Sequence, residues 1–257
     1  MGGIEIRTLS GSKIVLDDGR PYEGPVSDGD PELLDAVWRH VETNLAPVTA
    51  LAYYGAEAVR VDLLWVAPSR ERRFHTLVTC GMAERPMNPP ELAADCRFAE
   101  LVLCLPPEWP LSLAGDLPVE ARWPIHLLGG IALYVHRNTT WLWYGHTITS
   151  PVEKGPFAAD TLLANATLDH LRHFPDGFRI LEMEPEREIQ FFNLIPLYRE
   201  EVGLAMWKGT GTLLRRLDRM GYAEVVDPKR PNVATEDPRR GRPMAPPAIL
   251  PFPRRRS

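Results

Sequence analysis

Two short apolar segments in the middle of the chain have the composition of β-strands. They span residues 74–82 and 98–109, both are rich in strand-forming residues, and each ends at Gly or Pro. In the second segment, alternate residues fall on opposite faces, and Glu100 is the one charge inside an apolar run. We therefore predict two strands, joined over residues 83–97 by a Pro-bearing surface loop with room for a helical turn.

Further strands are predicted on both sides of this pair. Residues 59–66 alternate well enough to predict a half-buried strand, antiparallel to the first of the two segments. Residues 141–148 are the most aromatic predicted strand, and residues 178–183 are expected to pair with residues 189–194. Two apolar pieces within residues 4–22, separated by Ser-Gly-Ser, predict an N-terminal hairpin.

Helices are indicated by capping residues and by apolar positions at three- and four-residue spacing. Asp30 is a good N-cap, and Pro31 fits the first position of the helix that follows. Three more helices are predicted: from Trp123-Pro124 onward, from Pro196 through Trp207, and after the break at residues 209–211. Gly129-Gly130 weakens the second helix by roughly 1 kcal/mol per Gly relative to Ala. Close approach of a neighbouring strand would explain such small residues.

These elements predict an α+β fold, a mostly antiparallel β-sheet covered by helices. We expect one domain over residues 1–226 and a Pro/Arg-rich flexible tail over residues 227–257, where eight of 31 residues are proline. An apolar island in the tail, residues 248–252, either docks on the domain or binds a partner. Residues 157–174 are ambiguous, because a row that includes Leu162, Ala166 and His173 also fits a helix.

Charge and cysteine content narrow the class of protein. The net charge is −5, and the tail carries eight Lys/Arg against three Asp/Glu, so the tail is +5 and residues 1–226 are −10. An acidic body argues against specific nucleic-acid binding. Three cysteines without a C-x-x-C pair favour free thiols in a reducing compartment. No secretion signal is evident and the longest apolar run, residues 125–135, is too short to cross a bilayer, so we expect a cytoplasmic protein without a membrane partner.

Candidate catalytic patterns are incomplete. His170-x-x-His173 would place two imidazoles on one face if that segment were helical, and His126 and His146 would have to join through the fold. There is no G-x-S-x-G elbow and no G-x-G-x-x-G loop. Glu200 and Glu201 point about 100° apart on a helix, so they suit a structural role or a partner rim better than paired acid–base chemistry.

Four short motifs, in order, resemble the signature of the Suppressor of fused domain family. They are Thr79-x-Gly81-Met82, then Glu100-Leu101 with Leu105-Pro106-x-x-Trp109, then Gly145-His146, and finally Ile195-Pro196-Leu197-Tyr198-x-Glu200-Glu201. The resemblance covers most of residues 30–222. One departure is Ala83, where the family commonly has Ser. The resemblance also implies a strand near Leu162.

The family implies a binding function. Its eukaryotic members hold a transcription factor by adding a strand between two domains, a cleft whose residues cannot be carried over to a one-domain chain. Shorter bacterial members resemble immunity proteins. We therefore predict a non-catalytic, protein-binding module without metal or cofactor, of the immunity type that neutralises a cognate toxin with a basic domain. The predicted contact residues are Thr79, Gly81, Met82, Trp109, Tyr144, His146, Glu200 and Glu201.

Two alternatives remain at this point. The first is a metal-dependent hydrolase that uses some of His126, His146, His170 and His173. The second is a regulatory adaptor that acts through its basic tail.

Overall fold

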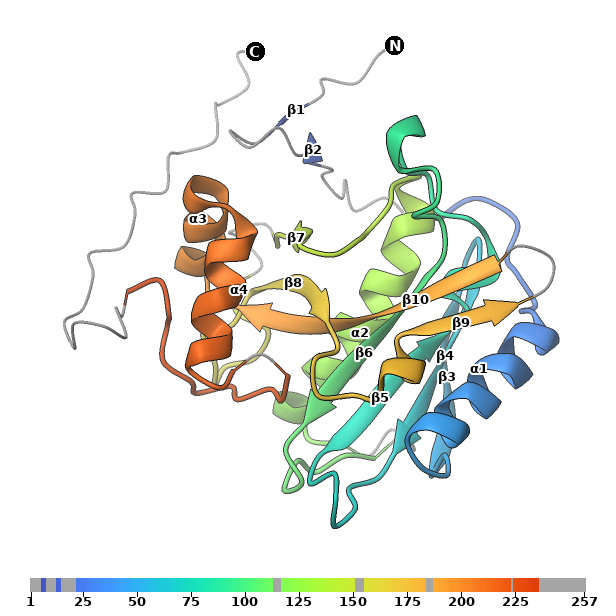
Figure 1. The fold of residues 1–257 in the computed structure, drawn as a ribbon, viewed down its shortest axis with the longest axis horizontal. Coiled ribbons are helices and arrows are strands. Elements are labelled where there is room, and N and C mark those ends of the chain that lie inside the picture. The colour runs from blue at the N-terminus through green and yellow to red at the C-terminus, as the bar shows by residue number, and fades with distance from the viewer. Residues whose placement is uncertain are drawn as a thin grey trace.

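The computed structural model describes residues 6–7, 13–14, 22–112, 117–150, 155–183, 187–222 and 224–235. Its centre is an eight-stranded sheet in the order β3-β4-β5-β6-β10-β8-β7, with β9 paired to β10. Only β6 and β10 run parallel; the other neighbours are antiparallel. Helix α1 covers one face of the sheet and α2 the other (Figure 1). The predicted α+β fold with a mostly antiparallel sheet is confirmed.

The elements have the following bounds. The strands of the sheet are β3 (Ala50–Ala56), β4 (Arg60–Val66), β5 (His75–Cys80), β6 (Ala99–Leu105), β7 (Thr147–Ile148), β8 (Asn165–His170), β9 (Ile180–Met183) and β10 (Arg187–Leu197). The helices are α1 (Pro31–Asn44), α2 (Val119–Arg137), α3 (Arg199–Lys208) and α4 (Thr210–Arg219). The predicted N-terminal hairpin is confirmed as β1 (Ile6–Arg7) paired with β2 (Lys13–Ile14).

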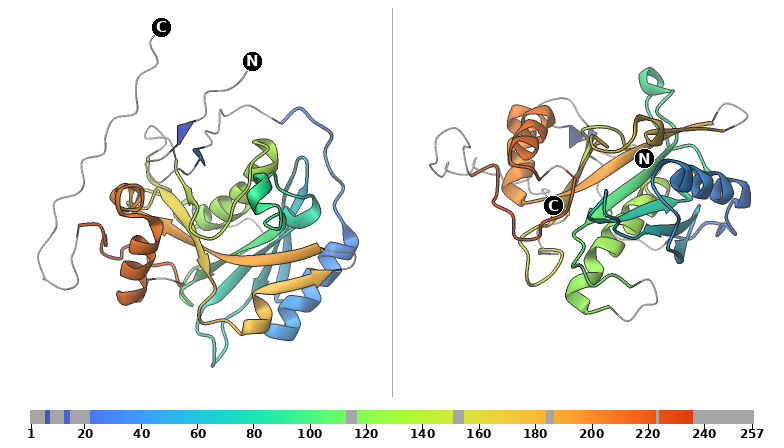
Figure 2. Two further views of the ribbon diagram at one scale, coloured as in Figure 1. Left: turned by 45° about the horizontal axis from the view of Figure 1, so that its top comes forward. Right: turned by 60° about the horizontal axis from the view of Figure 1, so that its bottom comes forward.

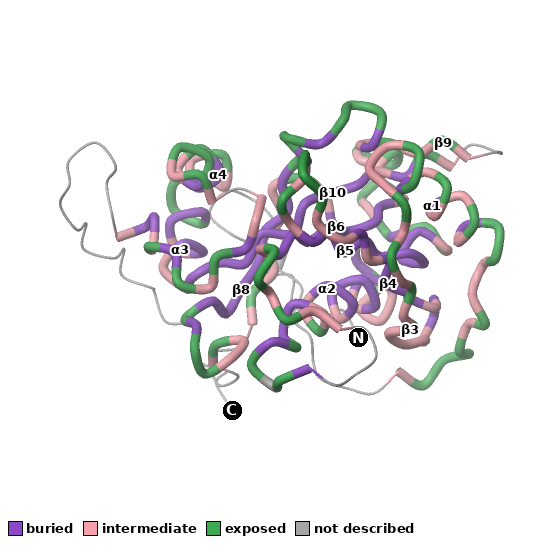
Figure 3. Tube along the Cα trace, turned by 90° about the horizontal axis from the view of Figure 1, so that it is seen from below, coloured by how far each residue is buried: buried purple, intermediate pink, exposed green. Residues whose placement is uncertain are grey.

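The two apolar segments form β5 and β6, which pair side by side in the middle of the sheet. Every residue of both strands is buried. On β6, Leu101 and Leu103 pack under α2, while Val102 and Cys104 pack under α1. Buried residues accordingly concentrate along these central strands (Figure 3). The prediction for β4 was wrong in one respect: the strand is buried on both faces, because helices cover both sides of the sheet.

The first helix follows its predicted caps. Asp30 Oδ1 accepts the amides of Glu32 and Leu33 at 3.0 and 3.1 Å, and Pro31 occupies the first position. The loop after β5 contains two short 3-10 turns, Met82–Glu84 and Glu91–Ala93, as the composition of residues 83–97 predicted.

Helix α2 begins four residues before Trp123, so the predicted start at Trp123-Pro124 was wrong and Pro124 lies inside the helix. Tertiary contacts hold the preceding turn. Ala121 and Trp123 are buried, and Trp109 Nε1 donates to the Ala121 carbonyl at 3.2 Å. A proline that normally marks a helix start is therefore tolerated one turn later.

Strand β3 was not predicted, because its sequence ALAYYGA is rich in Ala and Gly, which have low strand propensity. Pairing with β4 decides its structure. The expected close approach to Gly129 is confirmed: a Cβ atom there would lie 2.4 Å from the ring of Tyr54 on β3.

The aromatic segment 141–148 is not a strand, apart from β7 at its end. Residues 141–146 form a loop and a turn in which Gly145 has a φ of 77°. Strand propensity predicted the wrong structure here, since a left-handed turn ends any ladder.

Two further predictions for the C-terminal half need correction. Residues 165–170 form β8, antiparallel to β10, so the helical alternative for residues 157–174 was wrong. Pro196 does not begin a helix but lies within β10, opposite Ala166. The carbonyl of the next residue, Leu197, accepts from Ala164. The Pro196 backbone therefore faces away from β8, where its missing N–H removes no ladder bond.

Helices α3 and α4 pack side by side at the opposite end of the sheet from α1 (Figure 2). Their shared core includes Val233 and Ala234, which lie beyond the predicted domain boundary at residue 226. The packed body therefore extends to Thr235. The predicted flexibility of the rest of the tail, and the island at residues 248–252, lie outside the described residues. None of the described helices combines the length and apolar character needed to span a membrane.

The two adjacent glycines of α2 provide a matched test of the β3 contact. We expect Gly129→Ala to lower the free energy of unfolding by about 1–3 kcal/mol, because its Cβ overlaps the Tyr54 ring. Gly130→Ala should raise it by up to about 1 kcal/mol, because its nearest neighbour would lie at an ordinary 3.6 Å. Denaturant unfolding of both variants measures the difference. Equal effects would contradict the described contact.

Candidate partner-binding surface

The first two family motifs meet at the buried carboxylate of Glu100. Its Oε1 accepts from the amides of Gly81 at 2.9 Å and Ala83 at 3.0 Å, and its Oε2 from Thr79 Oγ1 at 2.5 Å. Thr79 Oγ1 in turn accepts the amide of Leu101 at 2.7 Å. None of these partners is a cation. Burial raises the pKa of Glu100 to about 6, and the hydrogen bonds to its charged form limit the rise.

The turn that supplies these amides requires glycine. Gly81 has a φ of 119°, and a Cβ atom there would lie 1.8 Å from the Arg60 carbonyl oxygen. The next residue, Met82, is fully buried, and its carbonyl contacts His136 Nε2 at 2.8 Å. The departure from the family at Ala83 leaves the carboxylate contact intact, because that contact uses the backbone amide.

Three of the predicted contact residues are therefore internal. Thr79 and Met82 are fully buried, and Gly81 is buried between them. As partner contacts these predictions need correction, since the folded domain offers a partner no access to them. Their physical role is to hold β5, β6 and the following turn around one carboxylate.

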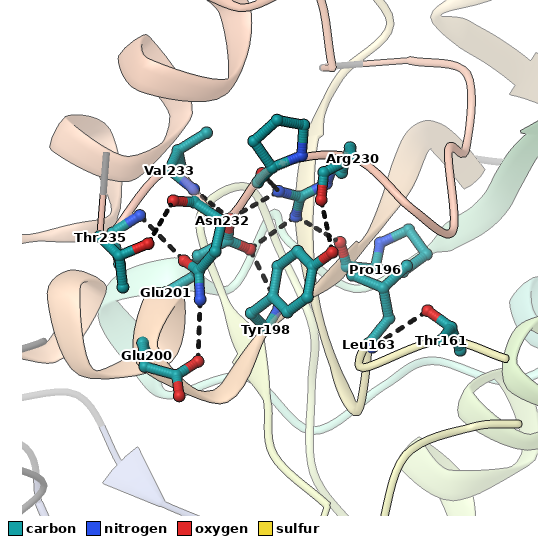
Figure 4. A network of polar contacts seen from close by, with 12 residues as sticks. Thr161, Leu163, Pro196, Tyr198, Glu200, Glu201, Arg230, Asn232, Val233 and Thr235 are labelled. Carbon is teal, nitrogen blue, oxygen red and sulfur yellow. Dashed lines mark hydrogen bonds and ion pairs between the residues drawn. The ribbon is translucent and has the colours of Figure 1, made fainter. Parts of the chain in front are cut away.

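The last family motif surrounds a second buried carboxylate, that of Glu201 (Figure 4). Arg230 binds it in a bidentate ion pair, with Nη1 at 2.6 Å from Oε1 and Nη2 at 2.5 Å from Oε2. The amides of Tyr198 and Val233 donate to the same carboxylate at 3.0 Å each. The side chains of Glu201 and Arg230 are 0% and 3% exposed, so Glu201 is not a surface contact either.

The ion pair holds residues 224–235 against the neighbouring helices α3 and α4. Arg230 Nη2 also donates to the Pro196 carbonyl at 3.0 Å, and the Tyr198 hydroxyl donates to the Arg230 carbonyl. Asn232 Nδ2 donates to Glu200 at 2.9 Å, which makes Glu200 part of the same network. Sequence reasoning assigned Arg230 to the flexible tail. No local pattern links residues 29 positions apart, so only the fold reveals this pair.

The three remaining predicted residues lie nearer the surface. Tyr144 is 40% exposed and stacks on His170, with ring centroids 4.3 Å apart. His146 is half-buried against the edge of Trp141, and burial lowers its pKa. Trp109 packs edge-on against Trp123 and belongs to the α2 core. Tyr144 is thus the predicted aromatic residue that best remains available to a partner.

The four histidines of the predicted hydrolase lie in different surroundings. His126 contacts Tyr54, and His173 Nδ1 lies 2.7 Å from Glu224. His170 ends strand β8, so the i, i+3 helical pairing with His173 was wrong. In the part of the chain that the structure describes, no three His, Cys, Asp or Glu side chains lie close enough to hold a metal ion.

Comparison with known protein families identifies the same family that the four motifs resemble. The family model of Suppressor of fused protein matches residues 57–231. No curated protein sequence matches the chain.

Among solved structures, a Suppressor of fused homologue from Neisseria gonorrhoeae is 14% identical, with a TM-score of 0.57, over 81% of this chain and 100% of its own. A chain of the Sufu–Fu complex is 15% identical, with a TM-score of 0.51, over 78% of this chain and 92% of its own. Drosophila Suppressor of Fused is 14% identical, with a TM-score of 0.51, over 79% of this chain and 53% of its own. At these identities the structures show a shared fold.

The raised pKa of Glu100 makes stability depend on pH. An acid that is harder to ionise when folded loses stability as pH rises from about 4.5 to about 6, because the unfolded chain releases its proton first. We expect the wild type to lose about 2 kcal/mol relative to Glu100→Gln in total, from pH values well below 4.5 to values well above 6. Unfolding of both proteins at several pH values measures it, with the non-titrating variant as control. A difference that is flat or that grows with pH would contradict this account.

We expect the buried ion pair of Glu201 and Arg230 to contribute far more to the free energy of unfolding than an exposed ion pair does. Arg230→Leu leaves the Glu201 carboxylate buried without its cation, and we expect a loss of about 3–5 kcal/mol in unfolding free energy. The control is Arg39→Ala, which breaks a pair with Asp35 whose side chains are 71% and 62% exposed, and which should change stability by less than about 1 kcal/mol. Similar losses for both variants would argue against a structural role for the buried pair.

Proposed function

Since this chain belongs to the Suppressor of fused protein family, we propose that it is a non-catalytic protein-binding module, specifically an immunity-type protein that neutralises a cognate toxin. The family match over residues 57–231 is the observation that carries the proposal. One structure of similar fold, the Sufu–Fu complex, is by its name an assembly with a partner protein. The buried polar residues of the family motifs support a non-catalytic role, because their hydrogen bonds hold the fold together.

Charge supports a basic partner. Residues 236–257 carry six Arg against two acidic residues, so residues 1–235 have a net charge of −9. A basic toxin domain would be drawn to such a body by long-range attraction, which raises the rate of encounter. Neutralising a toxin requires only that the inhibitor binds it stoichiometrically. Such a function needs no catalytic turnover, which agrees with a non-catalytic module.

Exposed aromatic side chains supply an anchor for the proposed partner at the end of the sheet that carries α3 and α4. Tyr144 is 40% exposed on its His170 platform, and Trp207 on α3 is 66% exposed. A Cβ atom at Gly145 would lie 3.9 Å from the side chain of Thr210, so the turn that carries Tyr144 adjoins the junction of α3 and α4. Aromatic residues of this kind dominate the energetics of protein interfaces.

We expect the chain to form a stable complex with a toxin encoded beside it and to restore growth when both are expressed together. The association rate should fall by roughly tenfold or more between 0.1 M and 1 M salt, as the screening length shrinks from about 10 Å to about 3 Å. Tyr144→Ala should weaken the complex by about 1–2 kcal/mol. The control is Val26→Ala, a side chain that is 64% exposed at a distant site.

Two results would reverse the proposal. Robust hydrolase activity that His146→Ala abolishes, or stoichiometric zinc in the purified protein, would favour the metal-dependent enzyme. The adaptor alternative is tested by deleting residues 236–257 and measuring partner binding. Deletion from residue 227 would be a poor test, because it also removes Arg230 and Val233 from the folded body.

A further inference from the structure

Leu92 lies in the loop between β5 and β6, and its side chain is fully exposed. Its exposed fraction is 104%, higher than that of any other large hydrophobic side chain that the structure describes. It belongs to the short turn Glu91–Ala93, which projects from the body near the C-terminal end of α2 (Figures 1 and 2). One exposed leucine is common on a protein surface. The construction of the loop and its charge distinguish this one.

The base of the loop is bound to a backbone turn that is unfavourable for its residue type. Thr139, just after α2, is the one described residue other than glycine with a positive φ, 47°. A β-branched residue rarely adopts this left-handed conformation. The Thr139 carbonyl accepts from Asn88 Nδ2 at 3.2 Å, and the Thr140 carbonyl accepts the Asn88 amide at 3.1 Å. The turn at residues 139–140 therefore supplies both acceptors that hold Asn88.

Neighbouring residues fix the base further. Met87 is 4% exposed and packs in the core under α2, and its amide donates to the Arg97 carbonyl at 2.8 Å. Pro89 and Pro90 follow Asn88, and each proline ring fixes its own φ angle. The loop is thus held before it meets a partner, which lowers the entropic cost of binding through its tip.

The tip of the loop, residues 88–96, carries negative charge. Glu91 and Asp95 are both exposed on it, and it contains no Lys or Arg. The nearest cations in the sequence, Arg85 and Arg97, lie outside the tip on either side of it. The tip therefore presents one large apolar side chain together with two carboxylates.

We propose that Leu92 enters an apolar pocket of the toxin and that Lys or Arg side chains at the rim of that pocket bind Glu91 and Asp95. This inference rests on the proposed function and adds a contact surface to it. Burial of Leu92 removes apolar area from water. A rim without cations would desolvate two carboxylates without a counterion, so the tip selects a basic partner.

This contact and the proposed anchor at Tyr144 are close enough for one interface. Thr140, which accepts the Asn88 amide, precedes Tyr144 by four residues, a span of at most about 14 Å along the chain. An interface of ordinary size covers some 20–30 residues on each partner. One toxin domain can therefore contact both the tip and Tyr144.

Two other occupants fit the tip less well. Residues 236–257 carry six Arg, but their apolar island, residues 248–252, is too short to enclose a leucine from several sides. A second copy of the chain has the same net charge of −5, so the two copies repel each other. The proposal is therefore committed to a separate, basic protein.

The first test uses the full-length chain and the toxin encoded beside it, with dissociation constants measured by calorimetry. We expect Leu92→Ala to weaken the complex by roughly tenfold or more, because the buried apolar area is lost. The control is Leu162→Ala, in the loop before β8, at a side chain that is 70% exposed. This control should change the affinity by less than about twofold.

A second pair of variants tests the basic rim. We expect Glu91→Lys/Asp95→Lys to weaken the complex at least about tenfold more than Glu182→Lys/Glu188→Lys does. Both double variants change the net charge equally, so long-range attraction falls by a similar amount in each. Glu182 and Glu188 are exposed and face each other across β9 and β10, so two lysines there preserve a pair of like charges. The difference between the double variants therefore measures the local contact.

The outcomes separate this surface from the proposed function. If the wild type binds the toxin and Leu92→Ala binds it equally tightly, the function stands and this surface is wrong. If the wild type does not bind the toxin, both are wrong. Equal losses in the two double variants would contradict the basic rim. A homodimer that Leu92→Ala dissociates would overturn the inference in favour of a second copy, and toxin binding that requires deletion of residues 236–257 would overturn it in favour of the tail.

Discussion

The carboxylate of Glu100 is the group around which the centre of this fold is arranged. It is fully buried between two central strands, and no cation in the described structure neutralises it. Its charged form is therefore stabilised by amide and hydroxyl donors. Those donors have to converge from the end of β5 and from the turn that follows. The turn can supply them only with Gly81 in a left-handed conformation against the Arg60 carbonyl. One buried charge thus accounts for the residue types of a motif that, on sequence alone, resembles a contact surface.

The two buried carboxylates solve the same problem in different ways. Glu100 relies on neutral donors, and burial raises its pKa to about 6. Glu201 has a bidentate arginine and two backbone amides, so four hydrogen bonds satisfy it. The first arrangement joins neighbouring strands and is local. The second joins residues 29 positions apart in the sequence. It holds residues 224–235 against helices α3 and α4. Both place family-motif residues inside the protein.

Exposed aromatic side chains of the described residues lie at both ends of the sheet. One end carries Tyr144 on its histidine platform, next to α3 and α4. The other end is formed by strand β3, which carries the exposed side chains of Leu51 and Tyr53. The acidic charge of the body acts over a longer range than either contact and affects the rate of approach. If the proposed partner is basic, this charge would attract it before any short-range contact forms.

The sequence by itself determined the elements whose local pattern agrees with their final environment. Capping at Asp30 predicted α1, and the apolar runs around Leu77 and Leu103 predicted the central strand pair, because propensity and burial act in the same direction there. Only the tertiary structure decided the elements whose local signals are weak or misleading. The alanines of β3 become a strand by pairing, the aromatic residues near Gly145 become a turn, and Arg230 becomes the partner of Glu201. In each case the deciding contact comes from residues distant in the chain, and local propensity holds no information about such contacts.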